Sequence, residues 1–171
     1  MLSYILGVEL RPLSMADAEV ARLWRNDEAI WKWCRQNDLI SHHQQMEWYK
    51  RQGSDPQIKM YSIYAANEFV GVCGLTSIDH VNSRAEFSLY IAPEHQRMGY
   101  ARKALKCLLM HAFKNLGLNL VWGETFDGNP AAKMFEELGF KKEGTRREFY
   151  FKEGKRIDCH LYSILASELK I

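Results

Sequence analysis

One stretch of this sequence restricts the fold more than any other, because strand, helix and strand patterns follow one another within it. Residues 85–91 alternate apolar and polar side chains, as a strand with one buried face does. Residues 100–116 repeat apolar side chains at the 3.6-residue period of an amphipathic helix, which Gly117 ends. Residues 119–125 are again typical of a strand. The stretch therefore predicts one strand–helix–strand crossover.

The rest of the chain supplies mainly strands that pair through hairpins. Residues 61–65 and 69–76 flank one short turn signal, and residues 141–151 and 156–165 flank another. The other predicted elements are a strand at residues 8–12 and helices that begin after Ser14, pass through Ile30 and Trp33, and span residues 42–52 and 130–138. We predict an α+β fold: a mixed, mostly antiparallel sheet of about seven strands, flanked by helices. No repeat, low-complexity tract or linker is recognisable, so residues 1–171 are predicted to form a single domain.

The composition argues against several classes of protein. Hydrophobic residues make up 47% and charged residues 26% of the chain, as in ordinary soluble proteins. A net charge of +2 is too small for a dedicated nucleic-acid-binding protein. The four cysteines lie far apart without metal-ligand spacing, so we expect reduced thiols, no metal site and a cytoplasmic location. No signal peptide or membrane-spanning run is recognisable, so no membrane partner is expected.

The loop before the helix at residues 100–116 is predicted to bind an anion. Amides of residues 96–99 would lack helical partners at the start of this helix, where the helix dipole adds partial positive charge. Gly99 allows the backbone to approach a phosphate without a side chain in the way. Arg97 and Arg102 add positive charge nearby. A surface turn with a solvated arginine is the alternative, and spacing alone does not separate the two.

The residues of this loop resemble a known family signature. Gln96-Arg97-Met98-Gly99-Tyr100-Ala101 is similar to the Gln/Arg-x-x-Gly-x-Gly/Ala motif of the GNAT acetyltransferase superfamily. The order of a hairpin, a glutamate-bearing strand, this motif, a long helix, Asn-Pro-Ala-Ala and Glu-Leu-Gly-Phe is similar as well. The ends of the chain resemble the branch that includes ribosomal-protein alanine, polyamine and nucleotide-amino-sugar N-acetyltransferases. The segments that carry this likeness are Arg11-Pro12-Leu13, Trp24-Arg25-Asn26, residues 143–147 and residues 158–165.

The resemblance implies both a fold and an acetyl donor. The fold would be the GNAT fold, with a V-shaped splay between its fourth and fifth strands, and the donor would be acetyl-coenzyme A (acetyl-CoA). Amides of the loop would hold the pyrophosphate, and the strand at 85–91 would pair with the pantetheine arm. The cofactor-binding residues implied in this way are Leu89, Tyr90, Ile91, Gln96, Arg97, Met98, Gly99, Tyr100, Ala101, Arg102, Asn129 and Phe135. Asn129 is also a plain N-cap candidate before the helix at 130–138.

Acetylation of an amine requires proton transfer, because an alkylamine is mostly protonated at neutral pH. Glu86 is the predicted catalytic base, since it lies on the polar face of its strand and the resembling branch often has a glutamate there. A carboxylate that only pairs with an arginine is the alternative. Phe135 departs from the family pattern, which commonly has a tyrosine acid at this place. Tyr150 is the predicted replacement, with Tyr90 as a second candidate, unless the thiolate of coenzyme A leaves unprotonated.

An aromatic and polar segment at residues 24–49 is expected to border the acceptor pocket, as in the resembling family. Its predicted substrate-binding residues are Trp24, Arg25, Trp31, Trp33 and Tyr49. Aromatic rings beside arginine suit a nucleotide, so the favoured acceptor is a nucleotide-linked amino sugar. Packing of Trp24 and Trp33 in the core is the alternative. Acetylation of a protein N-terminus or lysine, and a non-catalytic acyl-CoA-binding module, are the competing functions. We expect a monomer or a homodimer.

Overall fold

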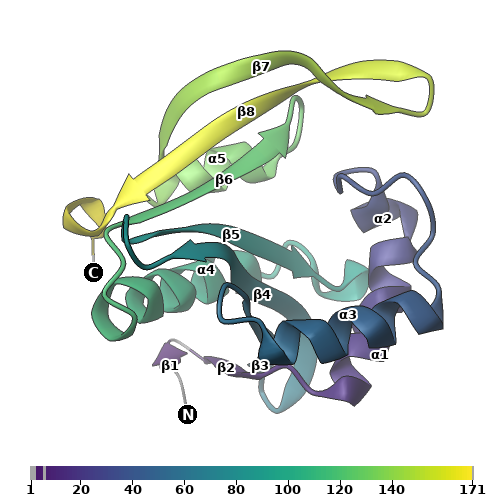
Figure 1. Cartoon of the computed structure of the whole chain (residues 1–171), viewed down its shortest axis with the longest axis horizontal. Coiled ribbons are helices and arrows are strands. Elements are labelled where there is room, and N and C mark those ends of the chain that lie inside the picture. Colours follow the sequence, from purple (N-terminus) through teal and green to yellow (C-terminus); the bar gives the residue numbers. More distant parts are fainter. Residues whose placement is uncertain (1–2, 6, 171) are drawn as a thin grey trace.

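The computed structural model describes residues 3–5 and 7–170, and their strands form one eight-stranded sheet (Figure 1). The strand order is β1-β2-β3-β4-β5-β6-β8-β7. The strands are β1 (Ser3–Ile5), β2 (Val8–Pro12), β3 (Lys59–Ala65), β4 (Glu68–Asp79), β5 (Arg84–Ile91), β6 (Leu120–Phe126), β7 (Lys141–Lys152) and β8 (Lys155–Leu165). The helices are α1 (Met15–Asn26), α2 (Glu28–Trp31), α3 (His42–Ser54), α4 (Tyr100–Met110) and α5 (Ala131–Glu137), with short turns at η1 (Pro93–His95), η2 (His111–Asn115) and η3 (Ala166–Glu168).

All seven predicted strands are present, and the structure adds one at the sheet edge. The additional strand, β1, pairs antiparallel with β2 through three residue pairs, from Ser3↔Leu10 to Ile5↔Val8. Three residues are too few for an alternating pattern to be recognised, and main-chain pairing with β2 decides their conformation. The predicted α+β class and mixed sheet are confirmed, while the predicted count of about seven strands becomes eight.

Local capping sets the starts of the helices on one side of the sheet. Ser14 and Asp27 each accept a hydrogen bond from a first-turn amide of the following helix, at 3.0 and 2.8 Å. Asp27 thereby separates α1 from α2. Ser41 and Gln44 exchange the two hydrogen bonds of a capping box at the start of α3. Each of these three helices therefore begins directly after a residue whose side chain caps it.

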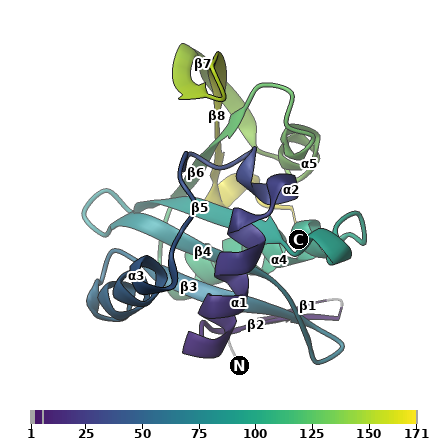
Figure 2. The same ribbon diagram turned by 90° about the vertical axis from the view of Figure 1, so that its right-hand side faces the viewer.

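Helices cover both faces of the sheet and enclose two cores (Figure 2). The larger core lies between the sheet, α4 and α5, and its fully buried side chains include Leu105 and Leu108. The smaller core lies under α1 and α3 and includes Ala18, Met60 and Val72. Because the central strands are packed on both faces, their edges and ends are held in a defined geometry.

The strands β5 and β6 are parallel and separate after a short paired region. Their three residue pairs are Arg84↔Leu120, Ala85↔Val121 and Glu86↔Trp122. Among the described residues, β5 continues beside β4 only and β6 continues beside β8 only. The two strands diverge into a V (Figure 1), which confirms the predicted splay between the fourth and fifth predicted strands. With β1 counted, these strands are β5 and β6.

An aromatic ring packs where the two strands separate. Phe87 follows the last paired residue of β5, and its ring lies so close to Gly123 of β6 that an added Cβ there would collide with it. The same ring contacts Phe135 and Phe140, with centroid distances of 5.2 and 5.3 Å. A side chain at position 123 would displace this ring, so glycine is required for the close packing of the two strands.

Two general features of the described residues bear on function. No helix among them is long and apolar enough to cross a membrane. No group of three or more histidine, cysteine, aspartate or glutamate side chains in the described part of the chain is arranged to hold a metal ion.

Candidate active site

The loop after β5 presents a row of main-chain amides. After η1 the chain takes positive φ angles at Arg97 (64°) and Gly99 (79°), and α4 begins at Tyr100. Within the described part of the chain, no hydrogen bond is donated by the amides of residues 97–102. An added Cβ at Gly99 would meet no atom within 4 Å. Unpaired amides at the positive end of a helix bind anions, so this loop has the donors for a phosphate group.

Side chains of the loop are mostly directed to solvent or to other parts of the protein. Gln96, Arg97 and Met98 are exposed, although Nε2 of Gln96 also donates to the carbonyl oxygen of Ile91 at 3.3 Å. Tyr100 and Ala101 pack against the larger core. Arg102 forms an ion pair with Glu137 at the end of α5. The anion-binding capacity of the loop therefore depends mainly on its main chain.

The edge of β5 beyond Glu86 is open toward β6. Leu89 and Ile91 direct their side chains to the larger core, and Tyr90 packs against the smaller one. Burial raises the pKa of Tyr90, which makes it a poor proton donor. These three residues therefore offer main-chain groups, rather than side chains, at the unpaired edge of β5. Such an edge can pair with an extended polar ligand.

The predicted residues of α5 and the loop before it have structural partners. Oδ1 of Asn129 accepts a hydrogen bond from the amide of Ala131 at 2.9 Å, so its capping role is present. Phe135 is 6% exposed, and its ring packs edge-on against Phe87 and Tyr162. The register of α5 thus gives this side chain a packing role in the core, and its contact with the cofactor stays a prediction.

Two buried carboxylates lie where β5 and β6 separate. Glu86, the predicted base, is 8% exposed and stands opposite Trp122 in the last pair of the two strands. Glu124 follows Trp122 by two residues, so strand alternation directs it to the same face of the sheet. The Glu124 side chain is 5% exposed. Both carboxylates therefore face the side of the sheet that α1, α2 and α3 cover.

Arg35, from the segment between α2 and α3, bridges the two carboxylates. Its guanidinium forms an ion pair with Glu86, and its Nε lies 2.6 Å from Oε1 of Glu124. Burial disfavours the charge of Arg35, but the hydrogen bond to Glu86 and the charges of both carboxylates raise its pKa. Two buried carboxylates without a cation would be strongly destabilising, so Arg35 stabilises this site by offsetting one of their two negative charges.

Two residues of β7 complete the cluster through Glu124. The hydroxyl of Tyr150 donates to Oε1 of Glu124, and Nη1 of Arg146 lies 3.2 Å from its Oε2. Arg146 and Tyr150 pair with Cys159 and Ile157, which are two residues apart on β8, because β7 bulges between them. The bulge thus brings Arg146 and Tyr150 close enough to share one carboxylate. Burial and the hydrogen bond to Glu124 raise the pKa of Tyr150.

The cluster unites the two predicted catalytic residues with three that were not predicted as site residues, which are Arg35, Glu124 and Arg146. Glu86 and Tyr150 are connected through Arg35 and Glu124. Glu124 had one signal in the sequence, a carboxylate on a predicted central strand next to the crossover. Arg35 had no signal in the sequence beyond its place in a polar segment. No sequence pattern shows which strand the side chain of a loop residue will contact.

Two of the predicted acceptor-binding residues pack against the smaller core. Trp24 lies against Phe69, with ring centroids 4.6 Å apart. The hydroxyl of Tyr49 donates to the carbonyl oxygen of Leu13 at 3.2 Å. Both rings border the core cluster under α1 and α3. Trp24 and Tyr49 therefore have packing roles, and their contact with an acceptor stays a prediction.

The other three predicted acceptor-binding residues also contact neighbouring protein groups. Lys152 places its Nζ 3.9 Å from the ring centroid of Trp31, and Lys32 lies 5.6 Å from that of Trp33. The carbonyl oxygen of Arg25 accepts a hydrogen bond from the side chain of residue 36 at 3.2 Å. The five residues thus form no common aromatic floor, which removes the main argument for a nucleotide-linked acceptor.

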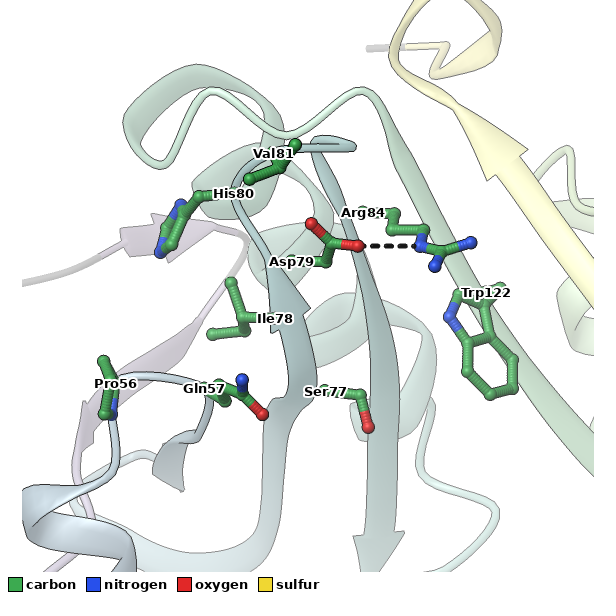
Figure 3. A pocket seen from close by; sticks show the side chains of 9 residues that line it. All are labelled: Pro56, Gln57, Ser77, Ile78, Asp79, His80, Val81, Arg84 and Trp122. Carbon is green, nitrogen blue, oxygen red and sulfur yellow. Dashed lines mark ion pairs between the residues drawn. The ribbon is translucent and has the colours of Figure 1, made fainter.

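A separate pocket of about 610 Å³ lies where β5 begins, away from the open end of the V (Figure 3). Its lining comes from the turn between β4 and β5, from the chain after α3 and from Trp122. Asp79 and Arg84 pair with each other across it at 3.3 Å. Their pairing leaves these two side chains with little net charge to offer a ligand.

Comparison with known proteins identifies the family. Residues 8–141 match the family model of an acetyltransferase (GNAT) domain. The chain is 27% identical to an uncharacterized N-acetyltransferase p20 of Bacillus licheniformis over 96% of both proteins, and 29% identical to spermidine N(1)-acetyltransferase of Vibrio cholerae over 93% of both. A crystal structure of spermidine N-acetyltransferase from Vibrio cholerae in complex with CoA and spermine has a TM-score of 0.90 at 28% identity, covering 95% of this chain and 97% of that one. With its splayed sheet and amide-lined loop, this chain belongs to the GNAT family of acetyltransferases.

Proposed function

We propose that this chain transfers an acetyl group from acetyl-CoA to a primary amine of a small, positively charged molecule of the polyamine class. Acetyl transfer to an amine is the activity of its family, and acetyl-CoA is the family's donor. The observation that carries the finer proposal is the pair of buried carboxylates, Glu86 and Glu124, at the splay. Such a pair needs a cation, and an ammonium group supplies one. The likeness to spermidine N-acetyltransferases supports the same class of acceptor.

The residues of the donor side fit acetyl-CoA through their main chain. The amides of residues 97–102 would receive the pyrophosphate, because they donate to no other group in the described part of the chain. The open edge of β5, at residues 87–91, would pair with the extended pantetheine arm. When bound, acetyl-CoA supplies the acetyl group as a thioester, which is activated for attack by an amine.

On the acceptor side, Glu86 acts as the base and Glu124 holds the positive charge of the acceptor. An alkylamine must lose a proton before it attacks, and the carboxylate of Glu86 accepts that proton, directly or through water. Glu124 is held by Tyr150, Arg146 and Arg35, whereas Glu86 has Arg35 as its one side-chain partner among the described residues. Glu86 is therefore the carboxylate with fewer protein contacts, which suits it to face the reacting amine.

Tyr150 is better suited to orient Glu124 than to act as an acid. Its hydroxyl already donates to Glu124, and burial, together with that hydrogen bond, raises its pKa. A thiol of the cysteine type has a pKa of about 8.5. A tyrosine of raised pKa does not readily protonate the thiolate of such a group, so the thiolate leaves without a protein acid. The proposed role of Tyr150 is to fix the position of Glu124.

A thiol-release assay with acetyl-CoA tests the proposal across three classes of amine. The panel contains polyamines and diamines, nucleotide-linked amino sugars, and peptides with free N-termini. We expect the highest kcat/KM with a polyamine. Glu124→Gln should raise the KM for that polyamine about tenfold, which corresponds to ~1.4 kcal/mol, without changing the KM for acetyl-CoA. A higher kcat/KM with a sugar nucleotide or a peptide would overturn the proposal.

A matched control separates recognition by Glu124 from general charge effects. Glu47 lies on the exposed face of α3 and forms only a weak contact with Lys50, at 3.6 Å. Glu47→Gln removes the same charge as Glu124→Gln, and it should leave both KM values unchanged. The expected monomer or homodimer stays a prediction, which light scattering of the same preparations would check.

A further inference from the structure

A buried lysine ties the hairpin of β7 and β8 to the helical side of the cleft. Lys152, at the tip of β7, is 5% exposed. Its Nζ donates to the carbonyl oxygens of Trp31, Cys34 and Gln36, at 2.6, 2.7 and 2.8 Å. Its three donors are thus used by three acceptors, and the ring of Trp31 adds a cation–π contact. The contact joins residues more than 110 positions apart in the sequence.

The acceptors of Lys152 flank the arginine that reaches the carboxylate pair. Cys34 and Gln36 are the two neighbours of Arg35, so Lys152 holds the peptide groups on both sides of it. Arg35 itself extends to Glu86 and Glu124. Because the main chain around Arg35 is fixed at these two points, Lys152 positions the guanidinium between the carboxylates.

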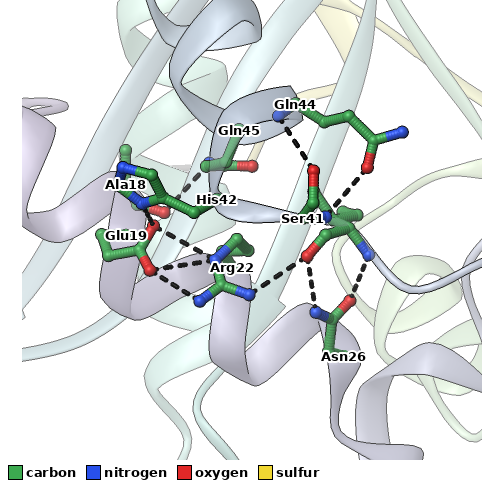
Figure 4. A network of polar contacts seen from close by, with 9 residues as sticks. Ala18, Glu19, Arg22, Asn26, Ser41, His42, Gln44 and Gln45 are labelled. Carbon is green, nitrogen blue, oxygen red and sulfur yellow. Dashed lines mark hydrogen bonds and ion pairs between the residues drawn. The ribbon is translucent and has the colours of Figure 1, made fainter.

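The segment between α2 and α3, residues 32–41, is anchored again at its far end (Figure 4). The main chain of Ile40 exchanges two hydrogen bonds with the side chain of Asn26, at 2.9 and 2.8 Å, and accepts a third from Arg22 at 3.1 Å. Residues 37–39, between the two anchors, are exposed. The segment can therefore move between its anchors more easily than the strands beneath it.

Two polar atoms of this region are buried without a partner. Within the described part of the chain, Nε1 of Trp31 and Oε1 of Gln36 are buried and make no hydrogen bond. A buried polar atom without a hydrogen bond is unfavourable relative to one that reaches water. Both residues also bind Lys152 through their carbonyl oxygens. The arrangement seen here thus carries a cost that movement of the segment would relieve.

We propose that Arg35 is an internal competitor for the acceptor, held by Lys152 in the place that the acceptor's ammonium group takes. This inference rests on the proposed function of Glu86 and Glu124 as the amine site. A guanidinium and an ammonium group satisfy the same two carboxylates, so a cationic acceptor binds by displacing Arg35. The side chain of Arg35 is 50% exposed, and solvent can therefore receive it when it leaves. Arg35 weakens binding of every cationic acceptor and keeps the carboxylates neutralised in its absence.

Removal of Arg35 should therefore strengthen acceptor binding. The probe is spermidine, titrated by calorimetry into the protein saturated with CoA, so that binding is measured without turnover. For Arg35→Gln we expect the Kd for spermidine to fall about tenfold and the KM for acetyl-CoA to stay unchanged. Lys152→Met should lower the Kd about threefold, because Arg35 remains but is less well positioned. Arg51→Gln, on the exposed face of α3, removes the same charge elsewhere and should have no effect.

An equal or higher Kd for spermidine in Arg35→Gln would overturn the inference. A second measurement on the wild-type protein covers the case in which this variant does not fold. Saturating spermidine should speed hydrogen exchange of amides 34–39 in the CoA-bound protein, because Arg35 leaves the carboxylates. Unchanged exchange would also overturn the inference.

Failure of the proposed function would look different. In that case the wild-type protein would neither bind nor acetylate any cationic amine of the panel. Ordinary turnover of spermidine by the wild type, with an unchanged Kd in Arg35→Gln, would reject the internal competitor and leave the proposed function standing.

Discussion

The proposed donor and acceptor sides of the site are built in different ways. The donor side is one contiguous piece of chain, from the open edge of β5 through the loop to the first turn of α4, and it offers main-chain groups. The proposed acceptor side collects five side chains from four separate parts of the chain: Arg35, Glu86, Glu124, Arg146 and Tyr150. A main-chain site depends on local conformation, whereas a side-chain cluster depends on strand register and on long-range packing. Substitutions should therefore affect the two sides separately.

The largest effect is expected at the base of the acceptor side. Glu86→Gln should lower kcat for amine acetylation about 100-fold or more, because a carboxamide accepts no proton at neutral pH. The KM for acetyl-CoA should change little, since the donor side is untouched. Steady-state kinetics with each substrate varied in turn checks both statements. A kcat close to that of the wild type would show that Glu86 has only a structural role.

The matching test on the donor side is Gly99→Val. Gly99 has a φ angle of 79°, which a β-branched residue adopts at a cost of about 1–2 kcal/mol. The loop should shift to relieve this strain, and the KM for acetyl-CoA should rise about tenfold while the KM for the amine stays the same. Gly117→Val, at a φ angle of 67° beyond the other end of the same helical segment, imposes similar strain away from the loop. Equal changes in the KM for acetyl-CoA in both variants would contradict a specific role of Gly99.

A third substitution tests the feature that both sides share, the separation of β5 and β6. Gly123→Ala places a Cβ where the ring of Phe87 lies, and overpacking of this kind costs about 1–3 kcal/mol. Urea unfolding should show that loss of stability. Gly144→Ala, in β7, has open space at its Cβ and serves as the control. If both variants lost the same stability, the packing of Phe87 on Gly123 would not be what shapes the V.

The smallest effect is expected from the ion pair of Glu19 with Arg22, which contributes to the stability of the folded state. The ion pair of Glu19 with Arg22, followed by its contact with His42, lowers the pKa of Glu19 to about 2 from the ordinary 4.5 (Figure 4). A lowered carboxyl pKa stabilises the folded state above pH 4.5, and this contribution is lost as the pH falls toward about 2.

Thermal unfolding of the wild type and of Glu19→Gln across this range measures that contribution. The wild type should have the higher Tm at neutral pH, and the difference should shrink steadily below pH 4.5. Glu19 is solvent-exposed in part, so the difference should be small and should decrease with added salt. A difference that stayed constant with pH would exclude titration of Glu19 as its cause.

Prediction from the sequence succeeded where the signal is local. The unpaired amides around Gly99 were predicted from one short motif, and the helix starts after Ser14 and at residue 42 were predicted from local patterns as well. Alternation along residues 85–91 correctly separated Glu86 and Tyr90 from Phe87, Leu89 and Ile91. Each of these features involves interactions within a few residues, which a pattern in the sequence records directly.

Prediction was weaker where the outcome depends on register or on distant contacts. The family resemblance implied a cofactor contact for Phe135, whereas the register of α5 packs its ring in the core. Trp24 and Tyr49 were grouped with arginines as an acceptor floor, yet both border the smaller core. An aromatic side chain packs equally well in a core or in a pocket, so its type alone does not assign it to either.

The amino-acid sequence by itself therefore determined the order of the elements, the crossover, the amide-lined loop and the family to which the chain belongs. Only the tertiary structure decided the composition of the acceptor site. It set β6 beside β5, so that Glu124 lies near Glu86. It also placed Arg35 between the two carboxylates, where Lys152, from a distant part of the sequence, holds the neighbouring main chain. The physical reason is the distance along the sequence between the residues that interact. Main-chain conformation follows from neighbours in sequence, whereas buried charges are brought together only by packing of segments that the sequence keeps far apart.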